Sequence, residues 1–252
     1  MSVTAADIAG GVTPREYRRL LGWPRGATIP EELLQIERRA RAWYGRHATP
    51  FAMTRRVAID VLGETTVAVN SGIVLKGAAL ARRLADGGAH ALLVCAVSAG
   101  SEAALEATHL WQSGRPEAAY SLERFAAAAA ERLVRHVASE VCASLRPRRE
   151  RLLPHLSPGC GGWDLAEQHR LMELLGGRPA IDAAEGGSAR LGPLTMLPSG
   201  AMHPQHSLLA VFGIADRQAR VRPAAACQSC DLDPCQFRRV PSARPDVLRV
   251  PS

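Results

Sequence analysis

Three cysteines towards the C-terminal end of the sequence have the spacing of metal ligands. Cys227, Cys230 and Cys235 follow the pattern Cys-x2-Cys-x4-Cys. Thiolates spaced in this way on a tight turn can converge on zinc or on an iron–sulfur cluster. The cluster therefore predicts one of these two metal centres, and its alternative is a set of three uncoordinated thiols.

A four-coordinate centre needs one ligand more than this cluster supplies. Cys160 is the first candidate, because it lies in a proline- and glycine-rich loop, where we expect flexible and exposed backbone. His155 and His203 are the alternatives, since an imidazole can also ligate zinc. We expect the metal centre to combine Cys160 with the three C-terminal cysteines.

The loop around Cys160 also has the composition of a small-molecule site. Gly159, Gly161 and Gly162 would let a ligand approach the backbone closely. The helix expected after Asp164 would add unpaired N–H groups at its start. The loop predicts a ligand cradle, and the alternative is an ordinary proline and glycine connection.

The helices and strands expected to position these residues follow one another in no regular order along the chain. Helices are predicted to begin at the Thr13-Pro14 and Thr28–Glu32 segments, each with proline and early acids. Alternating apolar residues predict two strands around a turn over 57–69, and Leu75, Leu80 and Leu84 then favour a helix over 72–88.

The continuous apolar run 91–97 is typical of a strand that is buried on both faces. Helices are expected over 102–112, from about 122 to 145, and from Asp164 to the glycines at 176–177, with a last apolar strand over 208–214. No strict βαβ rhythm is present, so the fold class predicted is a single α+β domain.

Charge and hydropathy exclude several function classes. The 252 residues contain 31 Lys and Arg against 24 Asp and Glu, a net charge of +7. Because Lys76 is the single lysine, arginine carries almost all of this excess, and no nucleic-acid motif accompanies it. We expect the charge to serve docking of an acidic protein partner, or to reflect genome composition, and we rank nucleic acid last.

No apolar run reaches the roughly 20 residues of a membrane span, and no secretory signal is recognisable. Six cysteines are too few for a disulfide scaffold in a chain of this length. A cytoplasmic protein without a membrane partner is therefore expected.

Several segments, in the same order along the chain, resemble a known family. Ser157-Pro158-Gly159-Cys160-Gly161-Gly162-Trp163 resembles the Ser-Pro-Gly-Tyr-Gly-Asp-Trp segment of stand-alone proteins similar to the activation (reactivation) domain of cobalamin-dependent methionine synthase. The other matching segments are Tyr17–Trp23, the pair Glu123 and Glu131, Leu194-Thr195, Ser199–Pro204 with Ser207, and the C-terminal cysteine cluster with Phe237-Arg238.

The resemblance implies a twisted antiparallel sheet flanked by helices, and it implies a function. A domain of this family binds S-adenosylmethionine along a groove and presents it to cobalamin on a partner, either a cobalamin-binding methionine synthase or another corrinoid protein. A flavodoxin-type donor supplies the electron for reductive methylation. The chain would then be a methionine synthase reactivation component with an N-terminal helical segment (1–50), an activation-domain-like core (51–222) and a Cys-rich tail (223–252).

The resemblance also assigns ligand-binding residues, with two departures from the family pattern. Carried over by position, they are Glu131, His155, Gly159, Cys160 and Gly161. His155 stands where the family has an arginine suited to a substrate carboxylate, and Cys160 stands where it has an aromatic residue. The alternative function is therefore a degenerate, non-catalytic paralogue that binds zinc or an iron–sulfur cluster through Cys160, Cys227, Cys230 and Cys235.

Overall fold

The computed structural model describes residues 3–24, 26–179 and 188–218. Two antiparallel sheets are present in this part, a six-stranded one with the order β3-β2-β1-β4-β10-β5 and a four-stranded one with the order β6-β7-β8-β9. The strands are β1 Phe51–Leu62, β2 Thr66–Val69, β3 Val74–Lys76, β4 Ala89–Ser98, β5 Glu150–Leu152, β6 Arg178–Pro179, β7 Ala189–Leu191, β8 Leu194–Met196, β9 Met202–His203 and β10 Ser207–Asp216.

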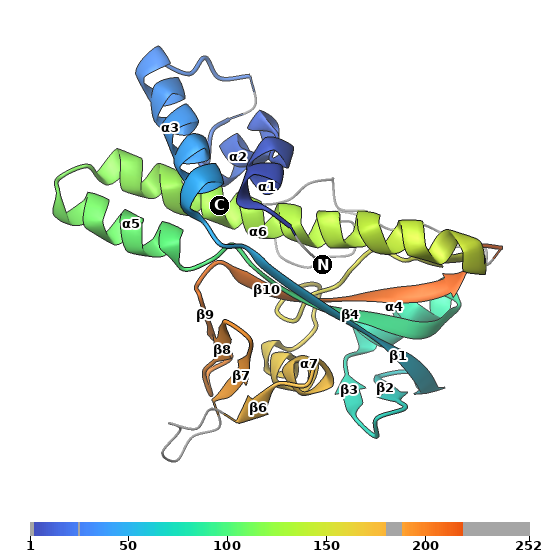
Figure 1. The fold of residues 1–252 in the computed structure, drawn as a ribbon. Coiled ribbons are helices and arrows are strands. Elements are labelled where there is room, and N and C mark those ends of the chain that lie inside the picture. The colour runs from blue at the N-terminus through green and yellow to red at the C-terminus, as the bar shows by residue number, and fades with distance from the viewer. Residues whose placement is uncertain (1–2, 25, 180–187, 219–252) are drawn as a thin grey trace, which may run out of the picture.

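The helices cover both faces of the larger sheet. They are α1 Ala5–Gly11, α2 Pro14–Leu20, α3 Glu31–His47, α4 Ala78–Gly87, α5 Glu102–Gln112, α6 Pro116–Leu145 and α7 Gln168–Leu174, with short 3₁₀ turns η1 Arg146–Arg148 and η2 Leu165–Glu167. Figure 1 shows α6 lying across one face with α1, α2, α3 and α5 beyond it, and α7 with the small sheet on the opposite side. This arrangement confirms the predicted α+β fold class with a twisted antiparallel sheet flanked by helices.

Strand β4 is the centre of the larger sheet, as its continuous apolar run predicted. It pairs with β1 from Phe51↔Ser98 to Ala58↔Ala91 and with β10 from Ser207↔Ser98 onwards. Leu93, Cys95 and Val97 face the core beneath α6, whereas Leu92 and Val94 face the opposite core. Because the side chains of a strand alternate between its two faces, a strand buried on both sides must be apolar at every position.

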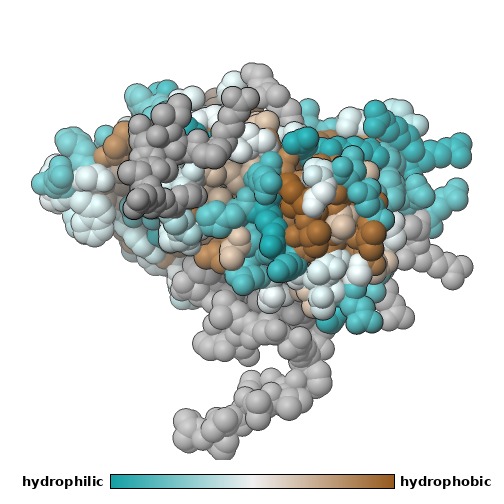
Figure 2. Space-filling view, turned by 90° about the horizontal axis from the view of Figure 1, so that it is seen from below, coloured by the Kyte–Doolittle hydropathy of each residue, from teal (hydrophilic) through white to brown (hydrophobic). Residues whose placement is uncertain are grey.

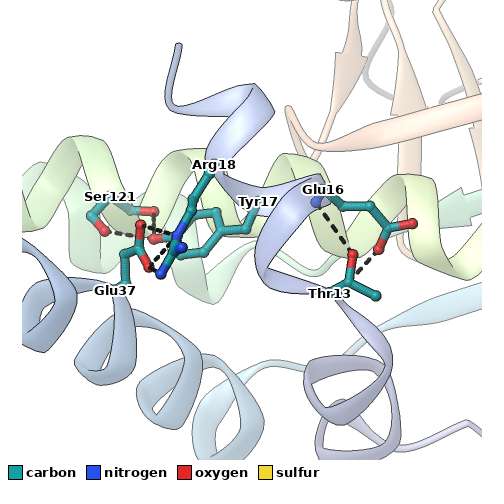
Figure 3. Close-up of polar contacts among 6 residues, drawn as sticks. All are labelled: Thr13, Glu16, Tyr17, Arg18, Glu37 and Ser121. Carbon is teal, nitrogen blue, oxygen red and sulfur yellow. Dashed lines mark hydrogen bonds and ion pairs between the residues drawn. The ribbon is translucent and has the colours of Figure 1, made fainter. Parts of the chain in front are cut away.

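The core on the α6 side is built around three aromatic rings. Phe125 of α6 is completely buried, and its ring centroid lies 5.0 Å from that of Tyr17 of α2 and 5.4 Å from that of Tyr44 of α3. The Tyr17 hydroxyl donates to the Ser121 carbonyl at 2.7 Å (Figure 3). The N-terminal helices are thereby fixed to α6 and, through it, to the sheet.

Helix α2 begins where the Thr13-Pro14 pattern in its sequence predicts. The Thr13 hydroxyl accepts from the Glu16 N–H at 3.3 Å, and the Glu16 carboxylate accepts from the Thr13 N–H at 2.9 Å (Figure 3). This reciprocal pair is a capping box, which satisfies two N–H groups that the first turn leaves unbonded. The predicted helix start at Thr13-Pro14 is therefore confirmed.

The core on the opposite side joins α4, α7 and the small sheet to the larger sheet. Its fully buried members include Leu75, Leu80, Leu171 and Leu194. Figure 2 looks at the molecule from this side and shows one area, right of the centre, in which apolar side chains gather within a hydrophilic surround. Val61 of β1 and Val74 of β3 are among the exposed large apolar residues.

The prediction of one helix over 72–88 was wrong in its first third. Residues 74–76 form β3, and Leu75 pairs with Val67 of β2 in the sheet. Helix α4 begins only at Ala78, after Gly77. Leucine spacing alone could not reveal that Leu75 is buried from a strand, because the strand is defined by its partner in the sheet.

One helix start also differs from the sequence prediction. Helix α6 begins at Pro116, six residues before the predicted start at 122, because Pro116 occupies the first turn. Helix α3 begins at Glu31, with Pro30 at the cap position, inside the predicted Thr28–Glu32 start. The helix predicted over 102–112 is α5 with the same bounds.

An ion-pair network links β5, at one edge of the larger sheet, to β1 and β4 in its middle. Glu150 of β5 accepts two hydrogen bonds from Arg56 of β1, both at 2.7 Å, and one from His90 of β4 at 3.0 Å. These hydrogen bonds, led by those from Arg56, lower the pKa of Glu150 to about 2. The carboxylate thus favours the folded state wherever it is ionised.

Replacement of Phe125 by alanine should destabilise the protein strongly. Loss of a completely buried ring that contacts Tyr17 and Tyr44 is expected to lower the free energy of unfolding by about 3–5 kcal/mol. Trp111, which is 53% exposed on α5, supplies the control, since Trp111→Ala should change it by less than about 0.5 kcal/mol. Urea denaturation followed by circular dichroism measures both, and equal effects would contradict the assigned core.

The Glu150 network should make stability depend on acid pH. Because the pKa of Glu150 is about 2 in the folded chain, below its ordinary value of 4.5, the contribution is complete above about pH 4.5 and is lost as the pH falls towards 2. Glu150→Gln should lower the free energy of unfolding at pH 7 by about 1 kcal/mol and reduce its loss between pH 4.5 and 2. Urea titrations at several pH values test this, and an unchanged pH profile in the variant would refute it.

Candidate functional site

The candidate ligand-binding loop, residues 155–163, leaves the sheet at the edge of β10 that does not pair with β4. Strand β5 pairs with residues 214–216 of β10, and Leu156 exchanges two backbone hydrogen bonds with Val211, at 2.8 and 2.9 Å. The chain then turns away at Ser157. Among the described residues, no strand pairs with this edge between Ser207 and Ala210. The loop therefore begins where the edge of β10 becomes available to a ligand.

The loop itself is a closed turn built on glycines. Gly159, Gly161 and Gly162 have φ angles of 84°, 62° and 76°, a region that glycine adopts without strain. The Gly159 N–H donates to the Trp163 carbonyl at 2.7 Å, and the Trp163 N–H donates to the Cys160 carbonyl at 3.2 Å. No hydrogen bond within the described residues uses the N–H groups of Gly161 and Gly162, so both can donate to a ligand.

A buried clamp joins the loop to the start of α4. Trp163 is 2% exposed, and its indole Nε1–H donates to the Lys76 carbonyl at 2.9 Å. On the same residue, the Lys76 N–H donates to the Glu167 carboxylate at 2.7 Å. Gly77 allows the indole to pack against the chain, because a Cβ there would lie 2.6 Å from Trp163 Cδ1. The loop is therefore held by specific contacts to a distant part of the sequence.

A second turn lies beside the loop. The Leu197 N–H donates to the Ala201 carbonyl at 2.8 Å, and Gly200 has a positive φ of 84°. The side chain of Leu165, which is 46% exposed, lies between the two turns, 3.3 Å from a Cβ built at Gly159 and 3.7 Å from one built at Gly200. The structure thus brings together the 157–163 and 199–204 segments that the family resemblance singled out.

His155 and Cys160 occupy different environments within the loop. The half-buried His155 ring lies with its centroid 5.3 Å from that of Phe212 of β10, whereas Cys160 is exposed. Phe212 belongs to the core beneath α6. His155 is therefore directed to the α6 side of β10, while Trp163 is buried in the core on the other side.

Glu131 lies on α6 and is engaged by a residue that sequence reasoning missed. Arg19 of α2 donates to the Glu131 carboxylate at 2.8 Å, and the two side chains are 19% and 24% exposed. The neighbouring pair Arg135–Glu16 links the same two helices at 2.8 Å. A cationic ligand at Glu131 would have to share the carboxylate with Arg19. The one feature of the sequence that could have pointed to Arg19 is its position inside the Tyr17–Trp23 segment, which resembles the family.

The predicted metal centre lies mostly outside the described residues. Cys227, Cys230 and Cys235 fall in the segment 219–252, so the four-thiolate site with Cys160 stays a prediction. Within residues 3–24, 26–179 and 188–218, no group of at least three His, Cys, Asp and Glu side chains could hold a metal ion. Cys95 is completely buried in β4, and burial raises the pKa of its thiol to about 12, which makes it unreactive.

The polar side chains that line a concavity between α2 and α3 already have hydrogen-bond or ion-pair partners within the protein. Its volume is about 190 Å³. Arg18 donates to Glu37 at 3.2 Å, and the Tyr17 hydroxyl is bonded to Ser121 (Figure 3). These groups serve the packing of the helices, so the loop at the β10 edge remains the better candidate site.

The fold of this chain is similar to that of a reactivation domain. The chain resembles a solved structure described as the MetH reactivation domain bound to AdoHcy, with a TM-score of 0.58 over 90% of this chain and 80% of that chain. The two sequences are 12% identical, so the likeness is one of fold. No protein-family model matches the sequence, and no curated protein matches it.

This likeness confirms the resemblance to a reactivation domain that the sequence motifs predicted. The roles of Glu131, His155, Gly159, Cys160 and Gly161 stay predictions. No helix in the part of the chain that the structure describes is long and apolar enough to cross a bilayer.

A methyl group added at Gly77 should displace the clamp. The buried indole of Trp163 cannot yield to a Cβ at 2.6 Å, so Gly77→Ala should lower the free energy of unfolding by about 1–3 kcal/mol. Gly10 of α1, with nothing within 4 Å of its Cβ position, is the matched control, and Gly10→Ala should stabilise by about 0.5–1 kcal/mol. Denaturation curves with tryptophan fluorescence measure both variants. If Gly77→Ala were as stable as the parent, the proposed clamp would be incorrect.

Proposed function

We propose that this chain is an activation-domain-like accessory protein that binds S-adenosylmethionine and assists reductive methylation of a corrinoid partner. The observation that carries the proposal is the fold likeness to a reactivation domain bound to AdoHcy, over 90% of this chain. A glycine-rich loop at a strand edge with which no other described strand pairs, where the resemblance implies the ligand, supports it further.

The loop residues would bind and orient the ligand. S-adenosylmethionine carries a carboxylate, an ammonium group and a sulfonium centre whose methyl group is electrophilic. The N–H groups of Gly161 and Gly162 can donate to ligand oxygens, and the exposed Leu165 offers an apolar contact. The carboxylate of Glu131 can attract a cationic group, in competition with the guanidinium of Arg19.

The protein partners in this proposal follow from the chemistry. Methyl transfer to an oxidised Co(II) corrinoid requires one electron, which a flavodoxin-type donor would supply, and it leaves S-adenosylhomocysteine. A cobalamin-binding methionine synthase or another corrinoid protein would present the metal. Donors of the flavodoxin type are acidic, and the net charge of +7 on this chain favours their approach.

The alternative proposal is a non-catalytic paralogue that binds zinc or an iron–sulfur cluster. Its support is the exposure of Cys160 at the end of the loop, where its thiol could meet other ligands. Metal content and visible absorbance of anaerobically purified protein, compared with Cys160→Ala, test it. Wild-type protein without zinc or iron, or a variant that retains the metal fully, would rule out a four-thiolate site that includes Cys160.

Restoring the family arginine should strengthen ligand binding. A guanidinium is always charged and can bind a carboxylate through two parallel hydrogen bonds, whereas an imidazole can offer a carboxylate only one at a time. His155→Arg should therefore lower the Kd for S-adenosylmethionine about tenfold in isothermal titration calorimetry. His109→Arg, on an exposed part of α5, adds the same charge elsewhere and should leave the Kd within about twofold.

The same titrations can reject the proposal. If neither the wild-type chain nor His155→Arg bound S-adenosylmethionine or S-adenosylhomocysteine at millimolar concentrations, the ligand assignment would be wrong. An equal gain in His155→Arg and His109→Arg would show that net charge, and not the loop, controls the affinity.

A further inference from the structure

Four exposed arginines, here called the arginine cluster, gather where β5 joins the larger sheet. Arg146 and Arg148 belong to η1, Arg149 follows it, and Arg217 comes directly after β10. The Arg149 N–H donates to the Arg146 carbonyl at 3.1 Å, and the Arg217 N–H donates to the Arg149 carbonyl at 2.8 Å. These backbone contacts hold the four residues together beside the end of α6 (Figure 1).

The positive charge of the arginine cluster is not neutralised by the described acids. No carboxylate in the described part of the chain forms an ion pair with any of the four arginines. Glu150, which follows Arg149, is already bound by Arg56 and His90. Asp216 is exposed and forms no ion pair with a described residue either. Such a surface favours an acidic partner.

Arg149 has a backbone conformation that arginine rarely adopts. Its φ of 55° and ψ of 31° are left-handed, and among the described residues it is the one non-glycine residue with a positive φ. Glycine adopts this conformation without strain. Packing does not explain the arginine, because its side chain is exposed. The local structure therefore does not require an arginine at this position.

Strand β5 has one edge, here called its outer edge, with which no described strand pairs. The strand lies last in the sheet order and pairs with β10. The Arg149 carbonyl and the Leu153 N–H are bonded to β10. Since the backbone groups of an antiparallel strand point to alternate sides, those of Glu150 and Leu152 point away from β10. The outer edge can therefore accept one more strand through main-chain hydrogen bonds.

The charge of the arginine cluster disfavours two occupants of this edge. A second copy of the chain would bring its own arginine cluster against this one, and like charges oppose such pairing. Residues 219–252 contain six arginines and three aspartates, so they are basic as well. The occupant is then a different protein, with carboxylates that face the guanidinium groups.

Nucleic acid matches this surface less well than an acidic protein does. No exposed aromatic side chain on which a base could stack lies in η1, in β5 or in residues 213–216 of β10. A phosphate backbone also lacks the alternating N–H and C=O groups with which the edge of a strand pairs. An acidic protein segment in extended conformation matches both the charge and the edge.

We propose that the arginine cluster and the outer edge of β5 together bind an acidic, extended segment of a partner protein, which adds to the sheet as a further strand. Main-chain hydrogen bonds to Glu150 and Leu152 supply the pairing. Contacts between the partner's carboxylates and the guanidinium groups select the partner.

This docking site is separate from the candidate ligand site. It lies at the other end of β10, since Ser207 and Asp216 are nine residues apart, which is about 30 Å along an extended strand. It does not depend on S-adenosylmethionine binding, so each proposal can fail without the other.

The test is fluorescence anisotropy of a dye-labelled peptide, Glu-Val-Glu-Val-Glu-Val-Glu, titrated with the full chain at pH 7 and fixed ionic strength. We expect saturable binding. A peptide of the same charge with proline in place of the central valine should bind at least about tenfold more weakly, because proline has no N–H to pair with the edge. Equal binding of the two peptides would show that charge alone acts, and would overturn the proposal.

Variants of the arginine cluster locate the site without disturbing the fold. Glycine suits the left-handed conformation, so Arg149→Gly should weaken peptide binding about fivefold while the midpoint of urea unfolding stays the same or rises. Arg148→Gln should weaken binding to a similar extent. Arg15→Gln removes an exposed arginine from α2, changes the net charge equally and should leave binding within about twofold. An equal loss in all three variants would contradict the assigned site.

Amide hydrogen exchange followed by NMR tests the strand pairing itself. Saturating peptide should slow exchange of the Glu150 and Leu152 amides and leave that of residues 207–210 unchanged. Absence of saturable binding, or of protection at β5, would overturn the proposal. So would a duplex DNA fragment that binds more tightly than the peptide and is released by the same arginine substitutions, because the cluster would then be a nucleic-acid site.

Discussion

The antiparallel pairing of β4 with β10 is the interaction on which the rest of the structure depends. The two strands pair along almost their whole length, and their side chains alternate between two cores. The core under α6 fixes the N-terminal helices through Phe125, and the opposite core fixes α4, α7 and the small sheet. Burial of apolar surface on both faces supplies most of the favourable free energy, so neither layer could be lost without exposing β4.

The position of the candidate site is set by the edge of β10 that does not pair with β4. Because β5 and Leu156 cover only the second half of that edge, the loop turns away where the first half begins. Glycines provide the turn, and the contacts of Trp163 and Glu167 with Lys76 keep it in place. A rigid loop at an open strand edge can select a ligand through backbone N–H groups without a deep pocket.

The sequence predicted elements whose pattern is local and missed features that depend on distant partners. The apolar run of β4, the capping box at Thr13 and the bounds of α5 could be predicted because propensity and periodicity determine them. By contrast, β3 was assigned to a helix, because its identity as a strand depends on pairing with β2. The loop residues were found through family resemblance, whereas the Trp163 clamp and the Arg19–Glu131 ion pair arise from tertiary contacts that no spacing rule predicts.

The most direct test of the account is amide hydrogen exchange in the presence and absence of saturating S-adenosylhomocysteine. If the ligand binds at the open edge of β10, exchange should slow in peptides that cover 156–163 and 207–211. Peptides from α2 and α3, which line the other concavity, should be unaffected. Unchanged exchange at the loop, or protection confined to the concavity between α2 and α3, would contradict the assignment of this edge as the ligand site.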